Sequence, residues 1–220
     1  MPLPSIQIET GSDPKFAVIW LHGLGADGHD FEPIVPELVD KSWPAIRFVF
    51  PNAPVRPITI NGGMPMRAWY DISGMEIAQK QDEAGIRDSV RLLNELIEQE
   101  AARGIASENI FLAGFSQGGA IVLAAGVRCK HKLRGIIALS TYLPIAEKTD
   151  GEMSPANRDV PIFMAHGMLD PTVSHALGEM SREYLKQRHY KIDWHAYPMA
   201  HQVCAEEIVD LKRWLGSRLR

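Results

Sequence analysis

Six short apolar runs recur along the chain, and patterns typical of helices separate most of them. The runs lie at 17–21, 46–50, 110–113, 135–139, 162–165 and 192–197. Their nearly continuous apolar character is typical of strands buried on both faces of a sheet. Helices are predicted near 31–41, 83–103, 117–128, 174–190 and 203–217. Because parallel strands need crossover connections, this alternation predicts an α/β fold with a mostly parallel sheet and helices on both faces.

The helix predicted over 83–103 has the clearest signals at its ends. Asp82 can cap its start, and Gly104 can end it in a left-handed conformation. Residues 51–78 form the one irregular stretch, in which prolines and a Gly62-Gly63 pair interrupt an unusually apolar segment. We find no linker or repeat and no insertion large enough for a separate lid, so residues 1–220 are expected to form one domain.

Composition excludes several classes of protein. A net charge of −4 provides no basic face for nucleic acid, which is therefore not an expected partner. The start lacks a secretory signal, and no segment reaches the ~18 apolar residues of a membrane span, so we expect a cytoplasmic protein without a stable membrane anchor. Cys129 and Cys204 lack the spacing of a disulfide framework or a metal site and are expected to be reduced thiols.

Ser116 is the candidate nucleophile. It stands at the centre of Gly114-Phe115-Ser116-Gln117-Gly118, between a predicted strand and a predicted helix. The glycines two positions to either side let the backbone turn sharply, so the hydroxyl projects from the sheet edge above the helix N-terminus. Free N–H groups at that terminus favour a developing oxyanion.

A nucleophilic serine needs a base, and the base needs an orienting acid. His201 follows the last predicted strand, and Asp170 leaves the end of the preceding one. Both residues are therefore expected at the carboxyl edge of the sheet, where Ser116 also emerges. Their order along the chain, serine then aspartate then histidine, is that of the α/β-hydrolases.

Each of these residues also has a structural interpretation. The serine can be a turn residue, Asp170 can cap the next helix, and His201 can bond a loop carbonyl. His22 and His166 also end strands, but their positions suit loop support better. The convergence of three such residues at one edge, in the expected order, favours the catalytic interpretation.

An oxyanion hole needs two N–H donors, which we assign to the backbones of Gln117 and Leu24. The side chains of these residues are then expected to matter less than the glycines around them. The segment 23–28 also matches the dinucleotide pattern G-x-G-x-x-G, but the acidic residue expected about 20 positions on is absent from 48–52. A nucleotide site is therefore disfavoured.

With these segments in place, the chain resembles the phospholipase/carboxylesterase family of α/β-hydrolases, near bacterial carboxylesterases and acyl-protein thioesterases. The resemblance runs nearly end to end, on segments at 21–28, 51–54, 68–72, 114–119, 166–171 and 201–203. It implies a single-domain α/β-hydrolase fold, a triad of Ser116, Asp170 and His201, and an oxyanion hole from the Leu24 and Gln117 amides. His29 and Gln202 stand where many relatives carry Asn and Ser, so substrate preference does not follow.

The expected activity is that of a serine carboxylesterase working through an acyl-enzyme, with no metal or organic cofactor. Short- to medium-chain esters are the expected small-molecule substrates, with acyl thioesters and lysophospholipids as further candidates. We assign Trp69, Met66, Met168 and Leu169 to the acyl-side wall, and core packing is the alternative for the loop residues. A peptidase and a non-catalytic binding protein are the other functions considered, and the oligomeric state stays open, a homodimer included.

Overall fold

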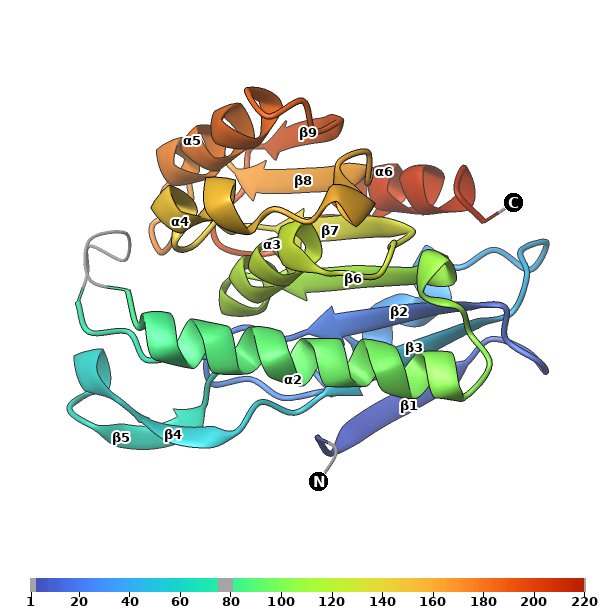
Figure 1. The fold of residues 1–220 in the computed structure, drawn as a ribbon, viewed down its shortest axis with the longest axis horizontal. Coiled ribbons are helices and arrows are strands. Elements are labelled where there is room, and N and C mark those ends of the chain that lie inside the picture. Colours follow the sequence, from blue (N-terminus) through green and yellow to red (C-terminus); the bar gives the residue numbers. More distant parts are fainter. Residues whose placement is uncertain (1–2, 75–80, 220) are drawn as a thin grey trace.

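The computed structural model describes residues 3–74 and 81–219 (Figure 1). Seven strands form one sheet in the order β1-β3-β2-β6-β7-β8-β9. They are β1 (Ser5–Glu9), β2 (Phe16–Leu21), β3 (Ile46–Pro51), β6 (Ile110–Phe115), β7 (Gly135–Leu139), β8 (Ile162–Gly167) and β9 (Ile192–Tyr197). β1 pairs antiparallel with β3, and the other pairings in this sheet are parallel. The predicted fold class is confirmed.

The chain reverses its direction of travel across the sheet at β2. β3 pairs with one edge of β2, whereas β6 pairs with the other. The connections that leave the carboxyl ends of β2 and β6 therefore run in opposite directions. Such a switch point is where open α/β sheets bind their ligands.

Helices cover both faces of the sheet, as predicted. α2 (Glu83–Ala102), α3 (Gln117–Arg128), α4 (Ala146–Glu152) and α5 (His175–Lys186) pack on one face, and α1 (Val35–Leu38) and α6 (Ala205–Gly216) on the other. Figure 1 shows α2 running across the front of the sheet. Alternate residues of β2 supply the two cores, Ile19 to the first face and Trp20 to the second. Burial of both faces explains why its sequence is continuously apolar.

The cap predicted for α2 is present, since the Asp82 Oδ1 accepts a hydrogen bond from the Gly85 N–H at 2.9 Å. The helix predicted over 31–41 is shorter, with one 3₁₀ turn at Glu32–Ile34 followed by α1. Pro33 and Pro36 each lack the N–H that a longer helix would use. Val39 then turns to an extended conformation, with φ −88° and ψ 158°, and ends the helix.

The irregular stretch 51–78 contains a hairpin that the sequence did not indicate. β4 (Val55–Ile58) pairs antiparallel with β5 (Met64–Arg67), and Pro57 stands opposite Pro65. A two-stranded sheet tolerates these prolines because each strand has a free edge. Residues 75–78 of this stretch lie outside the described residues.

Within 3–74 and 81–219, the helices are too short or too polar to cross a lipid bilayer.

Candidate active site

Ser116 occupies a sharp turn between β6 and α3. Its backbone has φ 54° and ψ −119°, a conformation that side-chain-bearing residues rarely adopt. The turn depends on two close approaches. A Cβ added to Gly114 would lie 2.5 Å from the Gly118 carbonyl oxygen, and one added to Gly118 would lie 2.4 Å from the Leu21 carbonyl oxygen. Glycine at both positions therefore lets the helix start against the end of β2.

The three predicted catalytic side chains meet at this turn. His201 Nε2 lies 2.8 Å from Ser116 Oγ, and His201 Nδ1 lies 2.7 Å from Asp170 Oδ2. An ionised carboxylate only accepts hydrogen bonds, so Nδ1 carries the proton and the Nε2 lone pair faces the serine hydroxyl. The arrangement can take a proton from Ser116 and return it to a leaving group.

Asp170 is fixed from within its own loop. Its Oδ1 accepts hydrogen bonds from the Thr172 and Val173 N–H groups at 2.8 and 2.9 Å, and its side chain is fully buried. The N-cap of α5 is Ser174, so Asp170 does not cap that helix. The structural alternative for Asp170 as a helix cap is therefore wrong.

The loops after β8 and β9 are joined by main-chain bonds that bring the acid to the base. The Met168 and Leu169 N–H groups donate to the carbonyls of Tyr197 and Met199, at 2.8 and 3.0 Å. A Cβ added to Gly167 would lie 2.3 Å from the Ala200 carbonyl oxygen. Glycine at 167 thus allows the two loops to touch.

The loop assigned to the oxyanion hole runs beside the nucleophile. A Cβ added to Gly23 would lie 3.6 Å from the Ser116 Cβ. Two residues later, the Gly25 N–H donates a hydrogen bond to the Arg67 carbonyl at 2.9 Å and holds the loop in place. Among the described residues, neither the Leu24 N–H nor the Gln117 N–H donates to a protein acceptor. Both groups remain available for an oxyanion.

The Gln117 side chain has a role that the sequence analysis missed. Its Oε1 accepts from the Trp69 N–H at 2.8 Å, and its Nε2 donates to the Tyr70 carbonyl at 2.7 Å. With Gln117 only 3% exposed, it connects the start of α3 to the segment after β5 in a buried site. A long amide at the start of a helix whose next ten residues are all small or apolar was the available signal.

His22 supports the loops, as its position suggested. Its Nε2 accepts from the Ala53 N–H at 3.1 Å, so its Nδ1 carries the proton and donates to the Gly23 carbonyl at 2.7 Å. Burial lowers the pKa of His22, which favours this neutral ring. His22 thereby connects the loop after β2 to the segment after β3.

The residues assigned to the acyl-side wall divide into two groups. Met168 and Leu169 are 50% and 71% exposed beside Asp170, and Met66 is half-buried, with its Sδ 3.8 Å from a Cβ added to Gly25. Trp69 is 1% exposed and donates from Nε1 to the His22 carbonyl at 2.9 Å. Its contacts therefore favour the core alternative, whereas the other three side chains keep exposed surface.

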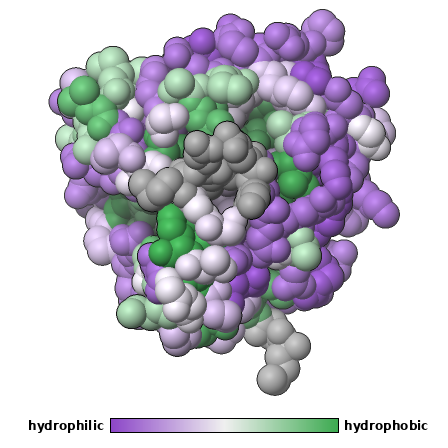
Figure 2. Space-filling model, turned by 90° about the vertical axis from the view of Figure 1, so that its left-hand side faces the viewer, coloured by the Kyte–Doolittle hydropathy of each residue, from purple (hydrophilic) through white to green (hydrophobic). Residues whose placement is uncertain are grey.

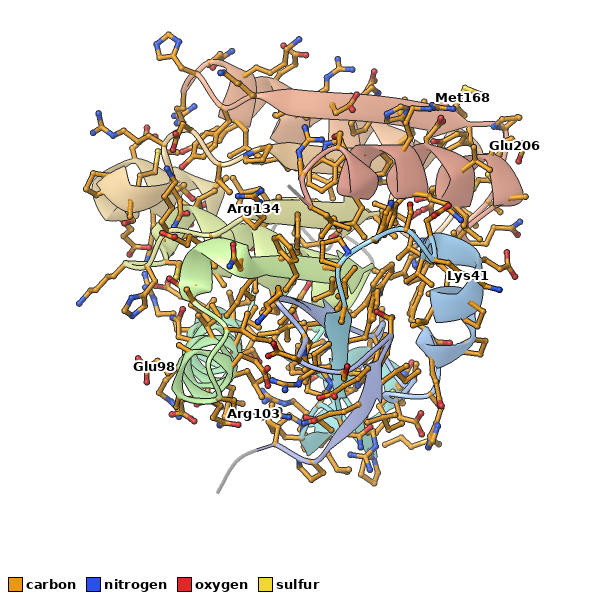
Figure 3. All side chains as sticks on the ribbon, turned by 90° about the vertical axis from the view of Figure 1, so that its right-hand side faces the viewer. Lys41, Glu98, Arg103, Arg134, Met168 and Glu206 are labelled. Carbon is orange, nitrogen blue, oxygen red and sulfur yellow. The ribbon has the colours of Figure 1, made fainter. Side chains whose placement is uncertain are left out.

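Two views show the opposite ends of the parallel strands. Figure 2 looks onto the side toward which the parallel strands point, and there hydrophobic patches alternate with polar surface. Figure 3 shows the opposite edge, where Arg134 precedes β7. A cavity of about 490 Å³ at that edge is lined by charged residues that include Lys132, Arg134 and Arg218, and none of its lining residues belongs to the triad. Within the described residues, no group of three or more His, Cys, Asp or Glu side chains could hold a metal ion.

The family model described as phospholipase/carboxylesterase matches residues 4–218. An acyl-protein thioesterase 1 from Neurospora crassa is 41% identical over 212 residues, which cover 92% of this chain and 86% of the relative. An acyl-protein thioesterase 1 from Cryptococcus neoformans is 37% identical over 220 residues, with 92% of each chain covered.

Solved structures share the same fold. The crystal structure of Arabidopsis thaliana SOBER1 superimposes with a TM-score of 0.88 at 30% identity, covering 93% of this chain and 99% of its own. Zea mays acyl-protein thioesterase 2 gives a TM-score of 0.87 at 24% identity, with 99% of each chain covered. The second likeness bears on the fold alone.

Proposed function

This chain belongs to the phospholipase/carboxylesterase family of serine hydrolases, and on that premise we propose that Ser116, Asp170 and His201 hydrolyse carboxylic esters and acyl thioesters. The observation that carries the proposal is the unbroken chain from Asp170 through His201 to the Ser116 hydroxyl. Three side chains from three loops reach hydrogen-bonding distance in the order that a nucleophile, a base and an orienting acid require.

The reaction follows from the direction of these bonds. Ser116 Oγ attacks the carbonyl carbon while His201 Nε2 takes its proton, and the carbonyl oxygen becomes an oxyanion facing the Leu24 and Gln117 N–H groups. The imidazolium then protonates the departing alcohol or thiol, which leaves an acyl-enzyme on Ser116. Water, deprotonated by His201, attacks the acyl carbon, and the imidazolium returns that proton to Ser116 Oγ as the acid is released.

Two features support the substrate class. The exposed Met168 and Leu169 next to the acid offer apolar contacts to an acyl chain, and polar surface lies between the apolar patches of this face (Figure 2). Relatives that are more than a third identical over most of the chain carry the name acyl-protein thioesterase. We therefore place short- and medium-chain esters and acyl thioesters first, and lysophospholipids as a further candidate.

The test is a substrate panel applied to Ser116→Ala and to a matched serine control. Ser174→Ala is suitable, because Ser174 is exposed and its side chain does not cap α5. Both variants and the wild type are assayed on p-nitrophenyl esters of increasing length, a palmitoylated cysteine peptide and a lysophospholipid. We expect Ser116→Ala to lose more than about 10³ of kcat on every accepted substrate while remaining folded, and Ser174→Ala to lose nothing. Ester hydrolysis retained by purified Ser116→Ala would reject the proposal.

A further inference from the structure

A second histidine stands beside the catalytic aspartate. His166 is the fifth residue of β8, and its side chain is fully buried. Its Nε2 lies 2.9 Å from the Val173 carbonyl oxygen and 3.5 Å from Asp170 Oδ2, the same oxygen that His201 contacts. The mechanism described above does not use this ring.

The hydrogen bonds fix the form of the His166 ring. A carbonyl oxygen only accepts, so Nε2 carries the proton. The other nitrogen, Nδ1, is buried without a partner among the described residues, and a Cβ added to Gly178 would lie 2.4 Å from it. A second proton on Nδ1 would have no acceptor, and burial lowers the pKa of His166 accordingly. The ring is therefore neutral and offers one N–H group toward the acid loop.

That N–H group closes a small circuit around Asp170. Val173 donates its own N–H to Asp170 Oδ1 at 2.9 Å and accepts from His166 at its carbonyl. A carboxylate has about four sites for donors. Thr172 and Val173 donate to Oδ1, His201 contacts Oδ2, and His166 Nε2 lies 3.5 Å from Oδ2 while its N–H donates to the Val173 carbonyl. The carboxylate is thus held at Oδ1 by the Val173 N–H, and the position of Val173 depends in turn on the His166 N–H.

We propose that His166 is a positioning residue for the reaction, whose neutral Nε2–H group holds Val173 and the Asp170 carboxylate in line with His201. The inference rests on the proposed function, because it assigns His166 a part in the same triad. A positioning role requires the N–H group at the Nε2 place of the ring, whereas a packing role requires only a side chain of similar volume.

Two amide variants separate these roles. In His166→Gln the side-chain nitrogen reaches the place of Nε2 and can still donate to the Val173 carbonyl. In His166→Asn the shorter amide reaches only the place of Nδ1, although it has the same chemistry. Each variant is measured for kcat and KM on an accepted ester, for urea unfolding, and by proton NMR for the low-field signal of the His201 Nδ1–H.

We expect His166→Asn to lower kcat roughly 10- to 100-fold with little change in KM, less than the ~10⁴ that follows when the triad acid of a serine protease becomes an amide. His166→Gln should recover kcat to within about threefold of the wild type. The low-field signal should persist in His166→Gln and weaken or shift in His166→Asn.

Equal losses in the two variants, or wild-type kcat in both, would overturn the proposal and leave His166 a packing residue. A wild type that hydrolyses no ester would instead reject the proposed function. The NMR comparison still decides the role of His166 in that case, because the bond between His201 and Asp170 does not depend on turnover.

Discussion

The side chain of Gln117 gives the most quantitative test of how the site is built. Gln117→Met keeps the length of the side chain but removes both of its hydrogen bonds, which leaves the Trp69 N–H and the Tyr70 carbonyl without partners. Trp69 and Tyr70 are 1% and 2% exposed, so water has little access to replace the lost bonds. An unpartnered buried backbone group costs ~1–3 kcal/mol, so the two together predict a loss of ~2–6 kcal/mol in the free energy of unfolding.

The measurement is urea unfolding followed by tryptophan fluorescence, with Gln202→Met as the matched control. Gln202 is an exposed glutamine beside His201, and its replacement should change stability by less than ~0.5 kcal/mol. Typical domains are stable by only ~5–15 kcal/mol, so Gln117→Met should clearly lower the urea concentration at the midpoint of unfolding. The backbone N–H of residue 117 survives the substitution, so kcat should fall less steeply than in Ser116→Ala.

Equal urea midpoints for Gln117→Met and the wild type would refute this reasoning. The packing of a methionine side chain would then stabilise the fold as much as the two hydrogen bonds of Gln117 do.

Three further substitutions test other parts of the account. Burial raises the pKa of Glu207 to about 8 from 4.5, so the folded protein keeps a proton that the unfolded chain releases, and stability should fall as pH rises between those values. Glu207→Gln should remove that fall and stabilise the protein at pH 7 by on the order of 3 kcal/mol. The measurement is thermal unfolding of both proteins from pH 5 to 8, and a difference in midpoint temperature that does not change with pH would contradict a buried, protonated carboxyl. Gly167→Ala should lower kcat by roughly 10², because its Cβ would meet the Ala200 carbonyl oxygen at 2.3 Å and push the loop of Asp170 away from His201. In the control Gly151→Ala the added Cβ meets open space, so kcat should not change. Trp69→Ala should destabilise the fold by ~3–5 kcal/mol and lower hydrolysis of acetate and long-chain esters equally, and a loss confined to long chains would place its ring in the acyl groove.

The sequence predicts the parts of this fold whose signals are local. Runs such as 110–113 are apolar on both faces because the strand is buried on both. This pattern can be recognised in the sequence without knowing which strands lie on either side. The serine turn also has a local signal, since Gly114 is required by a contact with Gly118 four residues on, although Gly118 itself also meets the end of β2. Residues at the ends of parallel strands share an edge, which placed Asp170 and His201 near Ser116.

The features that were missed depend on contacts that a sequence pattern does not reveal. β1 is short and half-exposed, and its strand character comes from pairing with β3. The hairpin of β4 and β5 is hidden by its prolines, which are typical of edge strands and not of central ones. Gln117 binds the backbone 47 and 48 positions away, a contact that no local pattern contains. His166 likewise looks like an ordinary strand-end residue until Val173 and Asp170 are placed around it.

The proposed role of Ser116, a nucleophile activated through His201 by Asp170, underlies every step of the reaction. Its most direct test is to react the folded protein with a fluorophosphonate, weigh the intact protein by mass spectrometry, and map the adduct by peptide sequencing. We predict one adduct per chain, located on Ser116, with labelling much slower in His201→Ala and Asp170→Asn. An unlabelled folded protein, or an adduct on another residue that forms at the same rate in all three proteins, would contradict the account.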